Sequence, residues 1–257
     1  MKIGITGCLG RVGSLLVEEI LAGQHDGVEL AGGTVLTADL DKMSDAGFFV
    51  TDSADELFTK SDAVIDFTLP QATREHVELA AKHQTTYVIA TTGLTDADEE
   101  QIHAASEKTR LVYSANYSIA VNMLEALTEK TAAALPDYDI EIIEGHHKYK
   151  IDAPSGTAIM LGRAAAKARG VNFNDKAVLS REGETGARTD GEIGFSTIRG
   201  GDMVGEHTVY FIGDGERLEL KQQATNRSLY AKGAIKAAKW AHDKENGLYT
   251  MRDVLGI

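Results

Sequence analysis

The chain has 257 residues, which is enough for one large domain or two smaller ones. Apolar residues make up 43% and charged residues 25%, which excludes a disordered or collagen-like chain and favours a folded globular protein. The 39 acidic residues outnumber the 26 Lys and Arg, and the net charge of −13 argues against nonspecific binding to nucleic acid or anionic membrane. An anionic ligand would therefore need a local cluster of cations.

Two further features restrict the compartment and the chemistry. No run approaches the roughly 18 apolar residues that a membrane span needs, and the first residues lead directly into a strand-like segment. We therefore expect a cytoplasmic protein without a membrane partner. The single cysteine, Cys8, excludes an intrachain disulfide and a zinc site built on several cysteines.

Residues 1–116 alternate short apolar runs with longer amphipathic runs. This alternation predicts βαβ units and a parallel sheet, so we expect an α/β, Rossmann-like dinucleotide-binding domain over residues 1–116. The predicted strands are residues 2–6, 28–37, 62–68, 86–90 and 110–114, and the predicted helices are residues 12–22, 71–82 and 96–108.

After residue 116 the pattern changes, and residues 117–227 predict a second, α+β domain. Two helices and four strands favour a mixed or antiparallel sheet, while the polar, glycine-rich segment 181–190 predicts a mobile loop. The helices are residues 121–135 and 157–169, and the strands are residues 138–143, 192–199, 207–212 and 217–224. A last helix, residues 228–242, could pack on either domain.

A glycine-rich loop separates the first predicted strand from the first helix, and it reads Gly7-Cys8-Leu9-Gly10-Arg11-Val12-Gly13. At this position, backbone N–H groups and the helix dipole can hold a pyrophosphate, and glycines allow its close approach. The spacing is G-x-x-G-x-x-G rather than G-x-G-x-x-G, so the prediction depends on the strand–turn–helix context. The alternative is an ordinary tight turn, in which Arg11 is solvated. Cys8 has no neighbouring base and is not interpreted as a nucleophile.

The end of the second strand bears on the choice of cofactor. It reads Thr34-Val35-Leu36-Thr37-Ala38-Asp39. No carboxylate lies where an NAD-binding unit places one for the ribose hydroxyls, and no arginine offers a site for a 2′-phosphate. Asp39 lies further along the chain and could replace the missing carboxylate. Both NADH and NADPH therefore stay candidates.

Three more loops follow strands of the predicted sheet, at the edge along which a dinucleotide lies. The small and hydroxyl residues there suit contacts with a nicotinamide ring, although each loop taken singly could be an ordinary turn. The last of the three also marks the expected change of domain. The candidate cofactor contacts are Phe67, then Ala90, Thr91 and Thr92, and then Ser114, Ala115, Asn116 and Tyr117.

Residues 144–158 are the richest segment for chemistry. His146, His147, Lys148 and Lys150 form the strongest local cation cluster of an acidic chain. The sequence Ser155-Gly156-Thr157 follows at a predicted helix start, where free N–H groups favour an anion by about 0.3–1 kcal/mol. Together they predict a site for a small carboxylate ligand, with histidine and lysine available for proton transfer.

Two other interpretations of this segment carry less weight. A zinc site would need a third ligand besides the histidines, and Glu144 is the obvious one. Adjacent residues such as His146 and His147 point to opposite faces of a strand, so we expect no metal. A solvated basic loop is the ordinary explanation of a charge run, but the turn into a helix at Ser155 favours a functional site.

The other histidines have no evident polar partners in the sequence. Five of them are expected to be structural or solvated, whereas His207 lies in a glycine-rich turn and could support an interface or a site. The five are His25, His76, His83, His103 and His242.

On these residues the chain resembles the dihydrodipicolinate reductase family, over essentially its whole length. The most specific match is His-His-x-x-Lys followed by Asp-Ala-Pro-Ser-Gly-Thr within residues 144–158. Departures from the family pattern are Val12, Ala90, Ala115 and the missing acidic residue near Val35. The further matches are residues 7–13, 65–68, 91–93, 116–118, 191–195 and 205–208.

The resemblance implies an NAD(P)H-dependent oxidoreductase of diaminopimelate and lysine synthesis. The implied reaction reduces 4-hydroxy-tetrahydrodipicolinate, through dihydrodipicolinate, to tetrahydrodipicolinate. His146 corresponds to the catalytic proton donor or acceptor and Lys150 to the proton donor. The implied contacts with the carboxylates of the substrate are His147, Lys150, Ser155, Gly156 and Thr157, and the implied cofactor loops are residues 7–12, 90–92 and 114–117.

The resemblance also implies an architecture and an assembly. A C-terminal helix, residues 228–257, is expected to complete the first domain, and the sheet of the second domain is expected to mediate a homotetramer.

Two other functions stay open. An aldehyde-type dehydrogenase needs a thiol in the second domain, whereas Cys8 lies in the first; a non-catalytic dinucleotide-binding sensor would need the glycine loop but neither His146 nor Lys150.

Overall fold

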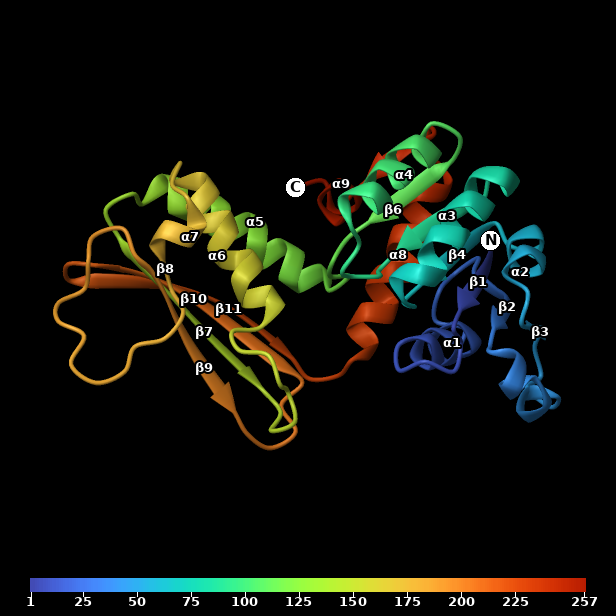
Figure 1. The fold of residues 1–257 in the computed structure, drawn as a ribbon, viewed down its shortest axis with the longest axis horizontal. Coiled ribbons are helices and arrows are strands. Elements are labelled where there is room, and N and C mark those ends of the chain that lie inside the picture. Colours follow the sequence, from blue (N-terminus) through green and yellow to red (C-terminus); the bar gives the residue numbers. More distant parts are fainter. The chain divides into compact units, whose positions relative to one another are not determined.

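The computed structural model describes residues 1–257 and divides them into two compact units. Unit 1 comprises Met1–Ile119 and Arg227–Gly256, and unit 2 comprises Ala120–Asn226 together with Ile257. None of the helices combines the length and apolar character of a membrane span. Figure 1 shows the elements of both units.

Unit 1 is built on a seven-stranded sheet in the order β12-β6-β5-β4-β1-β2-β3, with every pairing parallel. This order is that of a doubly wound nucleotide-binding sheet, so the α/β, Rossmann-like prediction is confirmed. The strands are β1 (Lys2–Thr6), β2 (Glu29–Thr34), β3 (Val50–Thr51), β4 (Ala63–Asp66), β5 (Thr86–Ile89), β6 (Arg110–Tyr113) and β12 (Gly247–Tyr249). The helices are α1 (Gly13–Leu21), η1 (Thr37–Met43), α2 (Ala54–Lys60), α3 (Pro70–His83), α4 (Asp96–Ser106), α8 (Ser228–His242) and α9 (Met251–Leu255).

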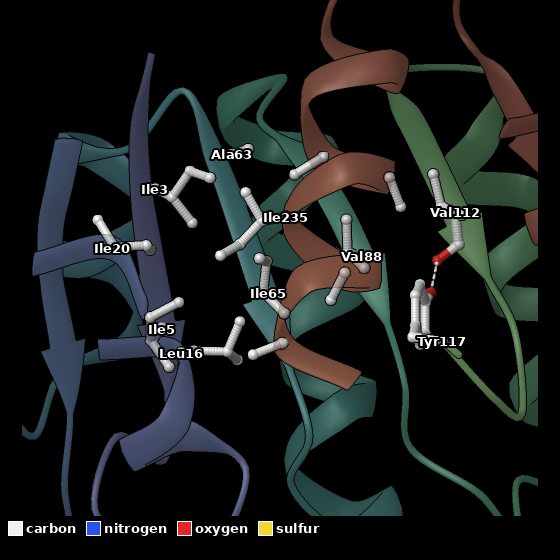
Figure 2. Close-up of a cluster of buried hydrophobic side chains, with 14 of the residues drawn as sticks. Ile3, Ile5, Leu16, Ile20, Ala63, Ile65, Val88, Val112, Tyr117 and Ile235 are labelled. Atoms are coloured by element: carbon white, nitrogen blue, oxygen red, sulfur yellow. Dashed lines mark hydrogen bonds between the residues drawn. The ribbon is translucent and has the colours of Figure 1, made fainter. Parts of the chain in front are cut away.

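Both faces of this sheet are buried, because successive strand residues point to opposite sides. On one face, Ile3 and Ile65 pack against Leu16 of α1 and Ile235 of α8 (Figure 2). The opposite face packs against α2, α3 and α4. Gly233 lets α8 lie close to the chain, since a Cβ there would lie 1.7 Å from the carbonyl oxygen of Tyr117.

The helix predicted over residues 228–242 is confirmed as α8, whereas the expectation that one helix continues to residue 257 is wrong. Helix α8 ends at His242, because the polar segment that follows does not continue its apolar face. Gly247–Tyr249 then forms strand β12, which pairs with β6, and α9 follows. The elements η1, β3 and α2 were not predicted.

Unit 2 contains a five-stranded mixed sheet in the order β11-β10-β7-β9-β8, covered on one face by α6 and its neighbours. Strand β7 pairs antiparallel with β10 and parallel with β9, so the prediction of a second, mixed-sheet domain is confirmed. The strands are β7 (Asp139–His146), β8 (Ala177–Val178), β9 (Ile193–Arg199), β10 (Gly205–Gly213) and β11 (Glu216–Ala224), and the helices are α5 (Ile119–Ala134), α6 (Gly156–Ala168) and α7 (Phe173–Lys176).

The segment 181–190 contains no helix or strand, and ion pairs fasten it to β7. Arg181 donates two hydrogen bonds of 2.9 Å to the carboxylate of Glu141, and Arg188 donates a third of 3.0 Å. Gly194 of β9 leaves room for this carboxylate, because a Cβ at Gly194 would lie 2.1 Å from Glu141 Oε2. Both ends of the segment are therefore anchored to the sheet.

Candidate active site

The glycine loop lies between β1 and α1 and is tied to the end of β2. Gly7 adopts a φ of +62°, which favours glycine, and its N–H donates to Thr34 Oγ1 over 3.0 Å. Gly13 begins α1 so close to the turn that a Cβ there would lie 2.2 Å from the carbonyl oxygen of Gly7. These two glycines bring the start of α1 against the strand end, where its N–H groups can meet an anion.

Cys8 contributes packing rather than chemistry to the loop. Its side chain is buried, and a Cβ at Gly33 of β2 would lie 2.6 Å from Cys8 Cβ. Burial raises the pKa of the thiol, which keeps it protonated at neutral pH. Only the backbone of Cys8 is therefore available to a ligand.

A cavity of about 330 Å³ opens beside this loop within unit 1. It brings together six of the predicted cofactor contacts, although they come from the ends of three different strands. Neither Asp nor Glu lines it, so the two guanidinium groups of Arg11 and Arg227 make it cationic. The lining residues are Arg11, Val12, Phe67, Thr68, Ala90, Thr91, Thr92, Arg227 and Tyr230.

Two of the lining residues were missed by sequence reasoning. Arg227 and Tyr230 belong to the start of α8, and the only sequence signal was a cation at the beginning of the last helix. The other predicted cofactor contacts do not line the cavity. Tyr117 is a core residue, whose buried hydroxyl lies 2.9 Å from the carbonyl oxygens of Ile89 and Val112 (Figure 2).

A buried carboxylate supports two residues of the cavity. Asp66, at the end of β4, accepts hydrogen bonds from the backbone N and hydroxyl of Thr68 over 2.7 and 2.6 Å. His76 Nδ1 lies 2.7 Å from its other oxygen, and the hydroxyl of Tyr87 donates to the same oxygen. Burial alone would raise the pKa of Asp66, but these bonds and the charge of His76 hold it below its ordinary value.

The expectation that His76 lacks polar partners is therefore wrong, although its role is structural. The same network reaches Thr91, because the hydroxyl of Thr73 lies 2.7 Å from Thr91 Oγ1 and 3.3 Å from Asp66 Oδ2. Asp66 thus positions hydroxyl groups on two neighbouring loops of the cavity.

In unit 2, a second buried carboxylate organises the segment 144–158. Glu144 of β7 is 1% exposed and lies 2.6 Å from His146 Nδ1. Arg199 of β9 binds both of its oxygens over 2.8 and 2.7 Å, and the backbone N of Ser155 donates to it over 3.0 Å. The carboxylate has no oxygen left for a metal ion, and residues 1–257 contain no cluster of side chains suited to one.

Arg199 also connects the two halves of the segment. It donates a hydrogen bond of 2.6 Å to the carbonyl oxygen of Asp152, and the side chain of Asp152 binds the ammonium of Lys150 over 2.7 Å. The orientation of His146 and the position of Lys150 therefore depend on the same guanidinium group. Sequence reasoning missed Arg199, which lies more than fifty residues from Glu144 in the chain.

The protonation of His146 follows from its surroundings. Burial lowers its pKa, and the charges of Lys150 and Arg199 lower it further, while the hydrogen bond and charge of Glu144 oppose them. The net direction is downward, so His146 is neutral at pH 7. Its Nδ1–H then donates to Glu144, and Nε2 presents a lone pair that can accept a proton.

The other predicted substrate contacts lie around the start of α6. Ser155 caps this helix by accepting a hydrogen bond from the backbone N of Ala158 over 3.2 Å. Gly156 and Thr157 are its first residues, and a Cβ at Gly156 would meet only open space. Nδ1 of His147 is shielded from solvent and has no hydrogen-bond partner in the structure.

His207 of β10 is brought into the same site. Its Nε2 lies 3.0 Å from Ser155 Oγ, and its ring centre lies 5.2 Å from that of His146. Burial and the neighbouring His146 lower the pKa of His207 to about 4. Its partner on β11, Gln222, is equally buried and was missed by sequence reasoning.

A Rossmann-type sheet with a cationic cavity, joined to a unit that aligns a neutral histidine and a lysine, defines a two-domain oxidoreductase. Comparison with known proteins places the chain more narrowly. The family model for the dihydrodipicolinate reductase N-terminus matches residues 1–117, and the model for the C-terminus matches residues 120–255. The chain therefore belongs to the dihydrodipicolinate reductase family.

Individual relatives agree with this placement. The 4-hydroxy-tetrahydrodipicolinate reductase of Rhizobium meliloti is 45% identical, covering 100% of this chain and 98% of that protein. The 4-hydroxy-tetrahydrodipicolinate reductase of Dinoroseobacter shibae is 48% identical, covering 99% of this chain and 98% of that protein. The structure of dipicolinate-bound dihydrodipicolinate reductase from Paenisporosarcina sp. TG-14 superposes with a TM-score of 0.81 at 26% identity, covering 97% of both chains.

Replacing Glu144 by glutamine tests the electrostatics of the site. The variant keeps the shape of the side chain but removes the charge that favours protonated His146, and it leaves Arg199 without its counterion. We expect the pKa of His146 to fall below that of the unmodified protein, measured by NMR titration of the imidazole. Glu206→Gln, on the opposite face of the sheet, is the control. An unchanged or higher pKa of His146 would contradict the arrangement.

Proposed function

We propose that the chain catalyses the NAD(P)H-dependent reduction of 4-hydroxy-tetrahydrodipicolinate, through dihydrodipicolinate, to tetrahydrodipicolinate in diaminopimelate and lysine synthesis. The single observation that carries this proposal is the alignment of His146 by Glu144 beside Lys150 and the start of α6. Family membership supports it. A dinucleotide sensor would need no such alignment, and no observation favours that alternative.

In this proposal, residues 1–116 and 228–257 bind the dinucleotide. The residues fit such a group for two reasons. Gly7 and Gly13 have no side chain to block the start of α1, and two guanidinium groups line the adjoining cavity. Gly7, Cys8, Leu9, Gly10, Arg11 and Val12 would hold the phosphates. The nicotinamide side would contact Phe67, Ala90, Thr91 and Thr92, together with the segment 114–117.

Residues 117–227 would bind the substrate through its carboxylates. The proposed contacts surround the N-terminus of α6, whose dipole favours an anion. The bound dipicolinate of the Paenisporosarcina reductase, a planar ring with two carboxylates, supports a ligand of this class. The proposed contacts are His147, Lys150, Ser155, Gly156 and Thr157.

Reduction requires a hydride and a proton. When bound, NADH or NADPH supplies the hydride, which adds to C4 of the ring after water has been lost from the 4-hydroxy compound. Lys150 donates the proton that neutralises the charge developing on the conjugated imine, and Asp152 holds its ammonium in place. His146 exchanges a proton through Nε2, since Nδ1–H is bound to Glu144.

Removing either proposed proton-transfer residue tests the activity. We expect His146→Ala and Lys150→Ala to lower kcat about 10²- to 10⁴-fold, the range of general acid–base catalysis, while the Kd for NADH stays within about twofold. Oxidation of NADH and of NADPH is followed at 340 nm, with substrate generated from pyruvate and aspartate semialdehyde by the preceding synthase.

Lys148→Ala is the matched control, because Lys148 lies in the same segment and its ammonium is directed to the ring of Tyr149. Absence of oxidation by the unmodified protein with either cofactor would refute the reductase and favour the sensor. The ratio of the two rates would decide the cofactor preference that Val35 and Asp39 leave open.

The cationic cavity gives a second test. Arg11→Ala removes one of two guanidinium groups without an acidic partner, and we expect the Kd for NADH to rise about 10- to 100-fold, the loss of one charge-assisted hydrogen bond. The affinity is measured by fluorescence titration. Arg163→Ala, which removes a guanidinium directed to the ring of Phe173 in unit 2, is the control. Equal affinities of the two variants would argue against phosphates at Arg11.

The open face of the unit 2 sheet would mediate a homotetramer. The outward positions of β7, β9 and β10 include Ile143, Ile198, Tyr210 and Ile212, which leave an apolar face uncovered within the unit. We expect sedimentation at four times the 27.6 kDa chain mass, and smaller species for Ile212→Asp. Leu21→Asp in unit 1 is the control, and a monomeric unmodified protein would refute the tetramer.

A reaction that consumes NADH or NADPH fits the expected cytoplasmic location.

A further inference from the structure

The hydrogen bonds of Ser155 are almost fully committed within the protein. Its backbone N–H donates to Glu144 over 3.0 Å, and its Oγ accepts from the backbone N of Ala158 over 3.2 Å. Only the hydroxyl proton is left for a carboxylate of the substrate. The direction of this proton therefore decides whether Ser155 attracts or repels that carboxylate.

His207 controls this direction, because its Nε2 lies 3.0 Å from Ser155 Oγ and its Nδ1 lies 3.4 Å from Gln222 Oε1. If Nδ1 carries the proton, Nδ1–H donates a hydrogen bond to Gln222, and Nε2 accepts a hydrogen bond from the hydroxyl of Ser155. If Nε2 carries the proton, it donates to Ser155 Oγ, and the hydroxyl proton turns to another acceptor. The amide of Gln222 suits either tautomer, since it offers an oxygen or an NH₂ group after a half-turn.

The hydrogen bonds that change are confined to the three side chains. Ser155, His207 and Gln222 are 2%, 4% and 7% exposed, so water competes little for their hydrogen bonds. In the first arrangement Ser155 presents a lone pair to an incoming carboxylate, which is unfavourable. In the second arrangement it donates a hydrogen bond, and each of the three groups still has a partner.

We propose that His207 and Gln222 are positioning residues for substrate binding, and that a bound carboxylate shifts His207 from the Nδ1–H to the Nε2–H tautomer. The hydroxyl of Ser155 then donates a hydrogen bond to the carboxylate. This inference rests on the proposed function of the site. The ring releases the Nδ1 proton to water and takes up a proton from water at Nε2, so the imidazole stays neutral, while the amide of Gln222 turns from acceptor to donor.

Protonation of His207 is a less favourable way to free Ser155. Burial and His146 lower the pKa of His207 to about 4, and Lys150 acts in the same direction, against Gln222 and Glu144. An imidazolium at pH 7 would therefore cost free energy, whereas a change of tautomer creates no charge. The two routes differ in a measurable way, because the imidazolium carries protons on both nitrogens.

The test is the ¹⁵N NMR spectrum of the ring nitrogens of His207 in the full chain, with dipicolinate as the probe. Without the probe, we expect a protonated Nδ1 and an unprotonated Nε2, and with saturating dipicolinate the reverse. The resonances are assigned from their loss in His207→Gln. The same tautomer in both states, or protons on both nitrogens with the probe, would overturn the proposal.

Variants provide an independent measurement. Gln222→Met keeps the length of the side chain but neither donates nor accepts, so we expect the Kd for dipicolinate to rise about three- to tenfold, the range of one neutral hydrogen bond. In a Ser155→Ala background the same change should have no further effect. Gln223→Met, whose amide binds Glu206 on the exposed face, is the matched control. Additive losses in the double variant would contradict the relay.

The outcomes separate this inference from the proposed function. An unmodified protein that neither oxidises NADH nor binds dipicolinate refutes both. Normal turnover and dipicolinate binding with an unchanged His207 tautomer refute the relay alone. The Kd for NADH and the thermal midpoint of Gln222→Met identify a variant that is merely misfolded, and the NMR measurement on the unmodified protein does not depend on any variant.

Discussion

The ion pair between Glu144 and Arg199 is the interaction on which the unit 2 site depends. A buried carboxylate is tolerated only with compensating charge and hydrogen bonds, and Arg199 supplies both in a bidentate geometry. Once Glu144 is held ionised, it fixes the Nδ1–H tautomer of His146 and the first backbone N–H before α6. Removing Arg199 would leave the buried charge of Glu144 without its counterion, and removing Glu144 would leave Arg199 unpaired, so geometry and electrostatics are lost together.

The alternation of the strands explains why the core and the site share one face of the sheet. Along β7, Ile140 and Ile142 point into the core, and Glu144 and His146 continue the same row. The neighbouring strands follow the same rule and carry polar residues at the end of the sheet where Glu144 lies. Phe195 precedes Thr197 and Arg199 on β9, Phe211 and Val209 share a row with His207 on β10, and Leu218 and Leu220 share a row with Gln222 on β11.

This geometry determines what the sequence could predict. The α/β fold, the glycine loop and the segment 144–158 are local patterns, so their residues are neighbours in the chain as well as in space. Arg199 and Gln222 meet Glu144 and His207 only through strand pairing, which depends on register between distant segments. A signal did exist, because polar residues at alternate positions that continue an apolar row belong to the buried face. The expectation that the last helix continues to residue 257 was wrong because propensity and periodicity do not reveal that the edge of β6 needs a partner.

The charge of the chain places a further constraint on both sites. A net charge of −13 repels a dinucleotide and a dicarboxylate at long range, so attraction must come from nearby cations that are not already neutralised. Arg74, Arg181, Arg188 and Arg199 are all held by carboxylates. Arg11 and Arg227 instead line a cavity without an acidic residue, where an anion meets their full charge. Lys150 is intermediate, because Asp152 holds its ammonium but is itself half exposed, which leaves the pair open to exchange for a substrate carboxylate.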